Sequence, residues 1–210
     1  MDEIKNIYCI GRNYVEHVHE LGNIVPTSPV VFTKPTHALV EANGQEIVLP
    51  SNQGEVHFEA ELVIKMGQDY DPELPVQDLI SEMTIGLDLT LRDVQSALKE
   101  KQHPWLLSKG FPNAAIIGKF IPFPGIESCA KKDFRLFIQN SLRQKGNIQH
   151  MIFPIGHLIR FIGENLGLKK GDIIFTGTPE GVGPLQEGDT LSLWWEEEEL
   201  GTCTMTFHHT

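Results

Sequence analysis

The clearest alternation of apolar and polar residues runs from position 56 to position 64. The apolar positions of this segment are Val56, Phe58, Ala60, Leu62 and Ile64, and the polar ones are His57, Glu59 and Glu61. Successive side chains of a β-strand point to opposite faces, so we expect Glu59 and Glu61 to point the same way, roughly 6.6 Å apart along the backbone. Like charges so placed raise each other's pKa unless a cation lies between them. The alternative interpretation is a half-buried strand with a solvated polar face.

Short apolar runs bounded by turn residues predict further strands. They lie at 4–10, 30–32, 46–49, 84–89, 116–122, 133–140, 172–176, 190–195 and 203–207. The last two predict a terminal hairpin, with the glutamate run 196–199 at its solvated tip.

Three segments predict helices. The strongest pattern is 154–166, where apolar residues recur at helical spacing between Pro154 and Gly167. A second helix is expected over 90–99 with Thr90 as its N-cap, and residues 11–22 predict a short polar helix or turn. Many short strands with few helices favour a mainly β roll or barrel. No repeat or linker divides the chain, so we expect one domain over residues 1–210.

Composition narrows the classes of function. The 28 acidic and 17 basic residues give a net charge of −11, which argues against nucleic-acid binding. No apolar run approaches the length of a membrane span, and no leader-like segment opens the sequence. Cys9, Cys129 and Cys203 are odd in number and far apart, which is typical of free thiols in a reducing compartment. We therefore expect a cytoplasmic protein that binds neither membrane nor nucleic acid.

A third carboxylate, Asp88, stands at the end of the predicted strand 84–89. If it lies beside Glu59 and Glu61, three carboxylates converge. Oxygen ligands of this kind select Mg²⁺ or Mn²⁺ over zinc, and three protein ligands leave positions for water or for a chelating 2-oxo acid. The pattern alone does not place Asp88 beside a strand 27 positions earlier.

Other polar residues have ordinary structural interpretations when taken singly. His17 and Glu20 would share one helix face within hydrogen-bonding reach, or lie in solvent. Arg92 and Gln95 would share the face of a solvated helix. Lys109, which follows an apolar segment, could extend its amine to the surface. The turn 177–184 lacks the Gly-Lys-Ser/Thr of a phosphate loop, yet it can bring backbone and the Thr178 hydroxyl close to a ligand.

Several short motifs, in order along the chain, resemble the fumarylacetoacetate hydrolase family, in its short branch of acylpyruvate hydrolases and oxaloacetate decarboxylases. The motifs are CIGRNY (9–14) with His17, FTKP (32–35), HFEAEL (57–62), DLTLRDVQ (88–95), Lys109, MIF (151–153) and TGTPEGVGP (176–184). Two departures are Phe58, where the family often has histidine, and Asn140-Ser141, where it often has Asn-Gly. Both fall outside the candidate ligands.

The resemblance implies a fold and a set of roles. It implies a mainly β, mixed α+β sandwich roll with a few short helices, usually a homodimer. It implies Mg²⁺ or Mn²⁺ held by Glu59, Glu61 and Asp88. His17 and Glu20 would form a catalytic dyad on a mobile lid, residues 11–25, with Lys109 as a further catalytic residue. The residues implied to contact substrate are Arg12, Arg92, Gln95 and Thr178.

The reaction that we expect is hydrolysis of a C–C bond in a 2,4-dioxo acid (an acylpyruvate). His17 would deprotonate a water, and bond cleavage would leave a metal-bound pyruvate enolate. Oxaloacetate decarboxylation passes through the same enolate and is the main alternative, followed by isomerisation or hydration of a related 2-oxo acid. An alternative of another class is a metal-stabilised β domain that acts as a binding partner without catalysis.

Overall fold

The computed structural model describes residues 4–20, 22 and 24–208. Within these residues the largest sheet has the strand order β2-β1-β13-β6-β7-β9-β3, and β10 pairs with β7. Its strands are β1 (Ile7–Gly11), β2 (Val30–Lys34), β3 (Leu39–Glu41), β6 (Ala60–Met66), β7 (Ile80–Asp88), β9 (Ala115–Ile117), β10 (Ile121–Pro122) and β13 (Ile173–Phe175). Most neighbours are antiparallel, whereas β1 with β13 and β3 with β9 are parallel.

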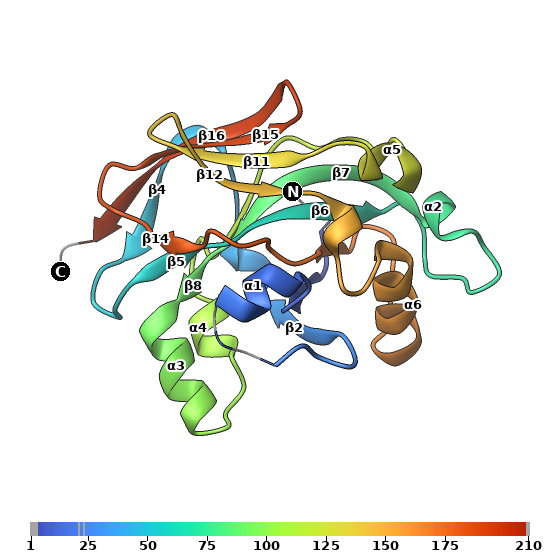
Figure 1. Ribbon diagram of the computed structural model, residues 1–210, viewed down its shortest axis with the longest axis horizontal. Helices are drawn as coiled ribbons and strands as arrows, with labels where there is room; N and C mark the ends of the chain where they lie inside the picture. Colours follow the sequence, from blue (N-terminus) through green and yellow to red (C-terminus); the bar gives the residue numbers. More distant parts are fainter. Residues whose placement is uncertain (1–3, 21, 23, 209–210) are drawn as a thin grey trace.

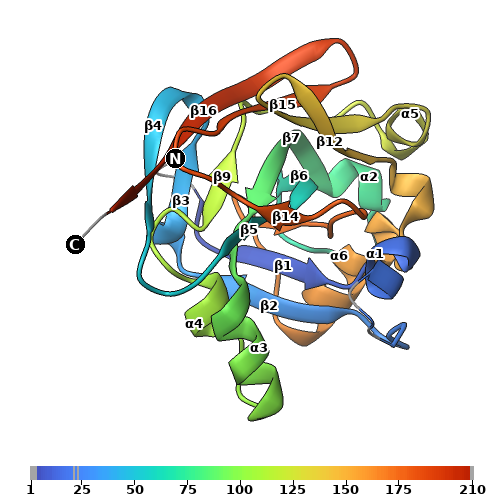
Figure 2. The same ribbon diagram turned by 60° about the vertical axis from the view of Figure 1, so that its left-hand side comes forward.

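A second sheet, in the order β12-β11-β15-β16-β4, packs against the first through contacts of β15 with β7 and of β11 with β6. Its strands are β4 (Asn43–Pro50), β11 (Phe134–Ile138), β12 (Ser141–Gly146), β15 (Thr190–Trp195) and β16 (Glu198–His208). Figure 1 shows this sheet above β6 and β7, and Figure 2 shows β1 and β2 on the opposite side. The predicted hairpin is confirmed, with Glu196 and Glu197 in its turn.

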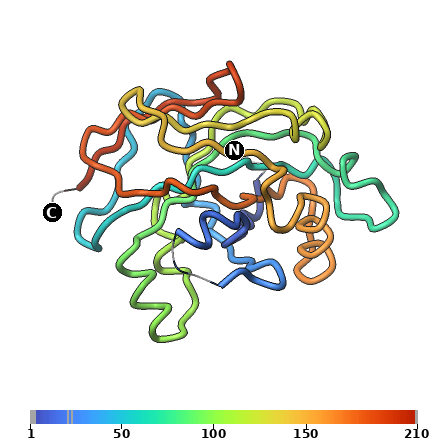
Figure 3. Tube along the Cα trace, in the orientation of Figure 1, coloured from blue at the N-terminus to red at the C-terminus, as the bar shows by residue number. Residues whose placement is uncertain are grey.

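Three short strands join at the side of these layers: β5 (Val56–Phe58), β8 (Thr90–Leu91) and β14 (Gly183–Pro184). The prediction of one strand over 56–64 is therefore wrong in one respect. The chain leaves the small sheet after Phe58 and enters the large sheet at Ala60, so that Glu59 lies at the junction. Figure 3 traces this stretch as one continuous tube, and Figure 1, in the same orientation, labels β5 and β6 along it.

The helices are short and lie outside the sheets (Figure 1). They are α1 (Val15–Glu20), α2 (Val76–Leu79), α3 (Arg92–Glu100), α4 (Leu106–Lys109), α5 (Ile126–Ala130) and α6 (Ile155–Asn165), with 3₁₀ turns η1 (Thr36–Ala38) and η2 (Ile148–His150). The pattern over 154–166 correctly predicted α6, whose Ile155, Leu158, Ile159 and Ile162 are buried. Thr90 is not the cap of α3, because it belongs to β8 and its hydroxyl bonds Glu59.

Both faces of the large sheet carry apolar side chains. Leu62 and Ile64 of β6 join the main core between the sheets, and Val63 joins a second cluster with Phe175 on the other face. Glu61 shares the face of Val63, so the strand that carries it is fixed by packing on both sides. The expectation of a mainly β protein with few short helices is confirmed. The three cysteines are buried and free, as predicted.

Candidate metal centre and active site

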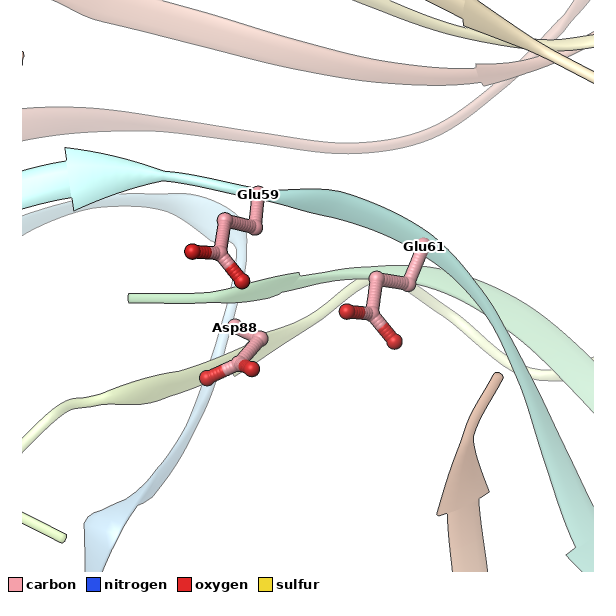
Figure 4. Close-up of side chains that lie close together, drawn as sticks. All are labelled: Glu59, Glu61 and Asp88. Atoms are coloured by element: carbon pink, nitrogen blue, oxygen red, sulfur yellow. The ribbon is translucent and has the colours of Figure 1, made fainter. Parts of the chain in front are cut away.

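The three predicted carboxylates converge. Asp88 ends β7, and its backbone N–H donates to the Glu59 carbonyl, which fixes the two strands in register. One oxygen from each of Glu59, Glu61 and Asp88 lies within 4.8 Å of the others, and all three residues are buried. Figure 4 shows the carboxylates of the two glutamates and of Asp88 turned toward a common space.

Gly86 stands opposite Glu61 in the pairing of β6 with β7 and leaves room for this arrangement. A Cβ atom at Gly86 would lie 2.7 Å from the Phe175 ring and 2.8 Å from the Ile116 carbonyl oxygen. The absence of a side chain is therefore required by the close approach of three strands behind the carboxylates.

Cations surround two of the three carboxylates. Lys109 Nζ donates to Glu59 Oε2 at 2.9 Å and to Asp88 Oδ2 at 2.6 Å. Arg92 donates to Glu59 Oε1 at 2.8 Å. Burial opposes ionisation of Glu59, yet the charges of Lys109 and Arg92 outweigh it and hold the pKa of Glu59 well below its usual range. The charges of Asp88 and Glu59 likewise outweigh the burial of Lys109 and raise the pKa of its ammonium.

Glu61 is in the opposite situation. It accepts a hydrogen bond from the Gly177 amide at 2.6 Å, and no ion pair of Glu61 occurs in the described part of the chain. Burial, followed by the charges of Asp88 and Glu59, raises the pKa of Glu61 well above its ordinary value. A carboxylate left without a cation beside two others is the electrostatic condition that a bound divalent ion would relieve.

Sequence reasoning missed Lys34, whose Nζ lies 2.7 Å from Asp88 Oδ1. This ion pair lacks hydrogen-bond geometry, and Asp88 Oδ1 has no hydrogen-bond partner. Lys34 donates to the carbonyls of Leu89 and Lys109. A buried carboxylate oxygen without a hydrogen bond is suited to a metal. The donor set thus fits a hard divalent cation held by the three carboxylates.

One cleft next to the carboxylates is lined by six of the predicted residues, Arg12, His17, Glu59, Arg92, Gln95 and Lys109. Arg92 donates to Gln95 Oε1 at 2.8 Å, so the two residues share a face of α3, as predicted. His17 Nδ1 lies 3.3 Å from Glu20 Oε2, which confirms the predicted reach of this pair along α1. The free space in the cleft is about 30 Å³, room for one or two water molecules.

Thr178 lies beside this cleft rather than on its lining. Its hydroxyl donates to the Ala60 carbonyl at 2.8 Å and accepts from Gln144 Nε2 at 2.9 Å. Gln144, which sequence reasoning missed, is buried in β12 and also bonds the Ala60 amide and the Pro179 carbonyl. A single glutamine in a strand of mostly polar residues gives no signal of this role.

The segment that Gln144 holds also contacts α1. The Gly181 amide donates to Glu20 Oε1 at 3.1 Å and Oε2 at 3.3 Å. Glu20 therefore contacts both His17 and the 177–184 turn. The predicted lid, 11–25, contains α1, and its positions 21 and 23 lie outside the described residues.

No helix in the described ranges is both long and apolar enough to cross a membrane. Comparison with known proteins gives consistent matches over nearly the whole chain. A relative from Homo sapiens, "Oxaloacetate tautomerase FAHD1, mitochondrial", is 38% identical over 205 residues, which cover 97% of this chain and 90% of the relative. "Oxaloacetate decarboxylase, mitochondrial" of Dictyostelium discoideum is 38% identical over 190 residues, covering 89% and 87%.

Among solved structures, a fumarylpyruvate hydrolase from Pseudomonas aeruginosa in complex with Mn²⁺ and pyruvate superposes with a TM-score of 0.88. It is 29% identical, and the match covers 98% of this chain and 91% of that one. The two curated relatives' names agree with the alternative drawn from the sequence, oxaloacetate chemistry, rather than with acylpyruvate hydrolysis. Residues 6–208 match the family described as fumarylacetoacetate (FAA) hydrolase C-terminal, so the chain belongs to the fumarylacetoacetate hydrolase family of enzymes.

Proposed function

We propose that this chain catalyses the keto–enol tautomerisation of oxaloacetate and that the same site promotes its decarboxylation. The observation that carries the proposal is the cluster of Glu59, Glu61 and Asp88 next to the cleft that contains Lys109 and His17. The relatives named oxaloacetate tautomerase and oxaloacetate decarboxylase support the choice of substrate. Tautomerisation passes through the enolate of oxaloacetate and decarboxylation through the enolate of pyruvate, and in both the negative charge develops on the C2 oxygen, so one site can serve both reactions.

Mg²⁺ or Mn²⁺ held by the three carboxylates is part of this proposal. The ion, when bound, would polarise the 2-oxo carbonyl and orient the adjacent carboxylate. The unpaired Glu61 and the unbonded oxygen of Asp88 support this assignment. The structure of the Mn²⁺-bound relative supports it independently.

His17 is the proposed base. With its Nδ1 facing the Glu20 carboxylate, the ring carries its proton on that side and leaves the Nε2 lone pair for substrate. His17 would take a proton from C3 of oxaloacetate, and a proton delivered to the C2 oxygen completes the tautomerisation.

In decarboxylation the C3–C4 bond breaks instead, CO₂ leaves with no proton from C3, and C3 is protonated afterwards. Lys109 and Arg92 would offset the negative charge that develops on the C2 oxygen in either reaction. Gln95 and Thr178 would orient the substrate.

The test uses the purified protein with Mg²⁺ and separates the two steps. Ultraviolet absorbance follows the loss of the enol form, and a coupled pyruvate assay follows decarboxylation. We expect both reactions to be faster with the protein than with Mg²⁺ alone. We expect this acceleration to be lost in Asp88→Asn. Absence of any acceleration with either Mg²⁺ or Mn²⁺ would contradict the proposal.

Acylpyruvate hydrolysis is the second candidate, and the His17–Glu20 pair favours it because a histidine oriented by a carboxylate can activate water. The structural relative named fumarylpyruvate hydrolase supports it. Release of pyruvate from acetylpyruvate, compared with oxaloacetate under the same conditions, ranks the two reactions.

We also propose that residues 1–210 form a single catalytic domain, that the protein is a homodimer and that residues 11–25 move as a lid. The cleft, with about 30 Å³ of free space, does not admit a four-carbon acid unless a wall moves. Light scattering that gives the 23.6 kDa mass of one chain, rather than twice that mass, would exclude the dimer.

The cytoplasmic location stays a prediction, since the curated relatives compared above are mitochondrial.

A further inference from the structure

One helix face carries polar residues outward from the carboxylate cluster. Arg92, Gln95 and Lys99 stand at positions i, i+3 and i+7 of α3 and therefore share a face. Arg92 bonds Glu59 at the inner end of this row. Lys99 is two turns further along, roughly 10 Å in backbone rise, and it lines the same cleft.

Lys99 and a second cation, Arg12, lie against the same aromatic ring at the outer end of the cleft. Its Nζ lies 5.4 Å from the centre of the Trp105 ring, and the Arg12 guanidinium carbon lies 5.8 Å from the same ring. Both cations and the ring line the cleft. The contact with the ring gives each cation modest stabilisation but supplies no negative charge.

The outer pair lacks a carboxylate partner. Neither Arg12 nor Lys99 forms an ion pair within residues 4–20, 22 and 24–208, whereas Arg92 is paired with Glu59. Arg12 Nε is buried and has no hydrogen-bond partner. In a chain with a net charge of −11, two neighbouring cations without an acid are held in place against their mutual repulsion. Burial and then the charges of Arg12 and Arg92 lower the pKa of Lys99 to about 8.

A bound anion would relieve this repulsion. Under the proposed function, the 2-oxo acid end of the substrate lies next to Lys109 and Glu59, so its far end extends toward Arg12 and Lys99, which line the same cleft. A methyl or alkyl group there would bury two cations without compensation, whereas a carboxylate would pair with both.

We propose that Lys99 determines specificity, binding together with Arg12 the second carboxylate of a short 2-oxo dicarboxylic acid. This inference rests on the proposed function, whose substrate oxaloacetate is such an acid, and it assigns the residues that recognise the second carboxylate. It assigns a role to Lys99 that neither the sequence motifs nor the relatives' names supply.

The test compares two stable ligands by isothermal titration calorimetry in the presence of Mg²⁺. L-malate and (S)-2-hydroxybutyrate share the 2-hydroxy acid end and differ in having a carboxylate or a methyl group at the far carbon. We expect the unmodified protein to bind malate about 10–100-fold more tightly, the value of a charge-assisted contact. Lys99→Met should lose most of that preference without weakening 2-hydroxybutyrate.

Two further variants control the result. Lys99→Arg keeps the charge and should keep the preference, and Lys101→Met removes an exposed lysine from the end of the same helix and should bind both ligands normally. No preference for malate in the unmodified protein, or an unchanged preference in Lys99→Met, would overturn the proposal.

The proposed function can fail separately. Malate binding requires no turnover, so an inactive protein with a Lys99-dependent preference would reject oxaloacetate catalysis and leave the role of Lys99 intact. Rapid oxaloacetate turnover without that preference would reject the role of Lys99 alone.

Discussion

Glu59 has a different environment from its neighbour two positions on, although both are buried glutamates. It accepts hydrogen bonds from Thr90, Arg92 and Lys109, at 2.8 to 3.0 Å. Charge-assisted bonds of this kind stabilise the ionised form enough to overcome burial. Glu61 has a single backbone donor. The same residue type is therefore a fixed anion at position 59, whereas at position 61 the metal-free protein favours the protonated form.

The sequence identified the glutamates but not this difference. Alternation along 56–64 is a local property, and it correctly indicated that Glu61 is held on a core strand, whereas Glu59 lies at the junction of β5 and β6. The partners of Glu59 come from residues 31 to 50 positions further on, Thr90, Arg92 and Lys109. No local pattern indicates which of two similar carboxylates those residues reach.

Replacing His17 with alanine tests the proposed base at the scale of one residue. We expect turnover of oxaloacetate enol to fall about 10²–10⁴-fold, the usual contribution of general-base catalysis. Binding of Mn²⁺ should be unchanged, because His17 is not one of the clustered carboxylates. His19→Ala, at an exposed position in the same helix, is the matched control. Equal turnover in the two variants would remove His17 from the reaction.

The lowered pKa of Lys99 predicts a pH dependence of ligand binding. Lys99 is charged below about pH 8 and becomes neutral above it, so the affinity for malate should fall as the pH rises through that value. The other charged groups that act on Lys99 are Arg12, Arg92, Lys109 and Glu59. The pKa of Lys109 is raised and that of Glu59 is lowered, so neither of these two changes charge over this interval.

Lys99→Arg provides the comparison, because arginine stays protonated throughout. Its malate affinity, measured by calorimetry between about pH 7 and about pH 9.5, should stay level where that of the unmodified protein declines. Parallel profiles for the two proteins would assign the pH dependence to another group.

At the scale of elements, the junction at Glu59 shows what periodicity can and cannot predict. Alternation continues unbroken from β5 into β6, yet the two strands belong to different sheets. Val56 and His57 pair with β8, whereas Ala60 pairs with Leu87 of β7. The choice of partner is made by distant segments, so a continuous pattern was interpreted as a continuous strand.

The helices also differ in whether the sequence predicts them. The α6 helix has eleven residues and a full apolar face, so its spacing predicts it directly. The α4 helix has four residues, which is too short for a periodic signal, and its Lys109 is positioned by packing against β2 and β8. The residues that sequence analysis missed at the site, Lys34, Gln144 and Lys99, are single polar positions in otherwise ordinary elements.

Gln144 connects β12 to the turn 177–184, and Gln144→Leu tests that connection. The change leaves the Ala60 amide and the Pro179 carbonyl without their partner. Two such losses should lower the free energy of unfolding by about 2–4 kcal/mol, and the melting temperature by on the order of 10 °C. Because Thr178 also loses a bond to Gln144, KM should rise more than kcat falls.

Gln149→Leu is the matched control for that experiment. Gln149 is exposed and makes one side-chain bond as donor, to the Ala130 carbonyl. Its replacement should change the free energy of unfolding by no more than about 0.5 kcal/mol. Equal melting temperatures for the two variants would mean that the Gln144 contacts do not hold the turn.

At the scale of the whole molecule, the candidate centre is assembled from four distant parts of the chain. Lys34 ends β2, the two glutamates flank the start of β6, Asp88 ends β7 and Lys109 ends α4. The sheet order places β6 and β7 side by side, which explains why Asp88 reaches the glutamates across 27 positions. This proximity is a property of topology, and only the family resemblance made it predictable from sequence.

The raised pKa of Glu61 gives the metal-free protein a defined response to pH. The folded state retains a proton on Glu61 that the unfolded chain releases above about pH 4.3. The folded state then binds more protons than the unfolded state, so stability should fall as the pH rises from that value toward the folded pKa. Glu61→Gln removes the titrating group, and urea unfolding of the metal-free protein at several pH values should show a weaker decline in this variant.

Metal binding should offset this loss of stability at higher pH, since a divalent ion favours the ionised form of Glu61. At about 100 times its dissociation constant, Mg²⁺ should add about 2.7 kcal/mol, or roughly 5–11 °C in melting temperature for a chain of this size. Oxalate, a planar mimic of the enolate, should add a second shift in melting temperature only when Mg²⁺ is present.

The variant Glu61→Gln should melt at a higher temperature than the unmodified protein without metal, because it lacks the buried titrating carboxyl group. It should also lose most of the Mg²⁺ shift, because it lacks one of the ligands. A melting series with Mg²⁺, oxalate and both together measures each step. A Mg²⁺ shift without any oxalate shift would favour a metal-stabilised binding domain over an enzyme, and an equal Mg²⁺ shift in Glu61→Gln would move the ion away from the three carboxylates.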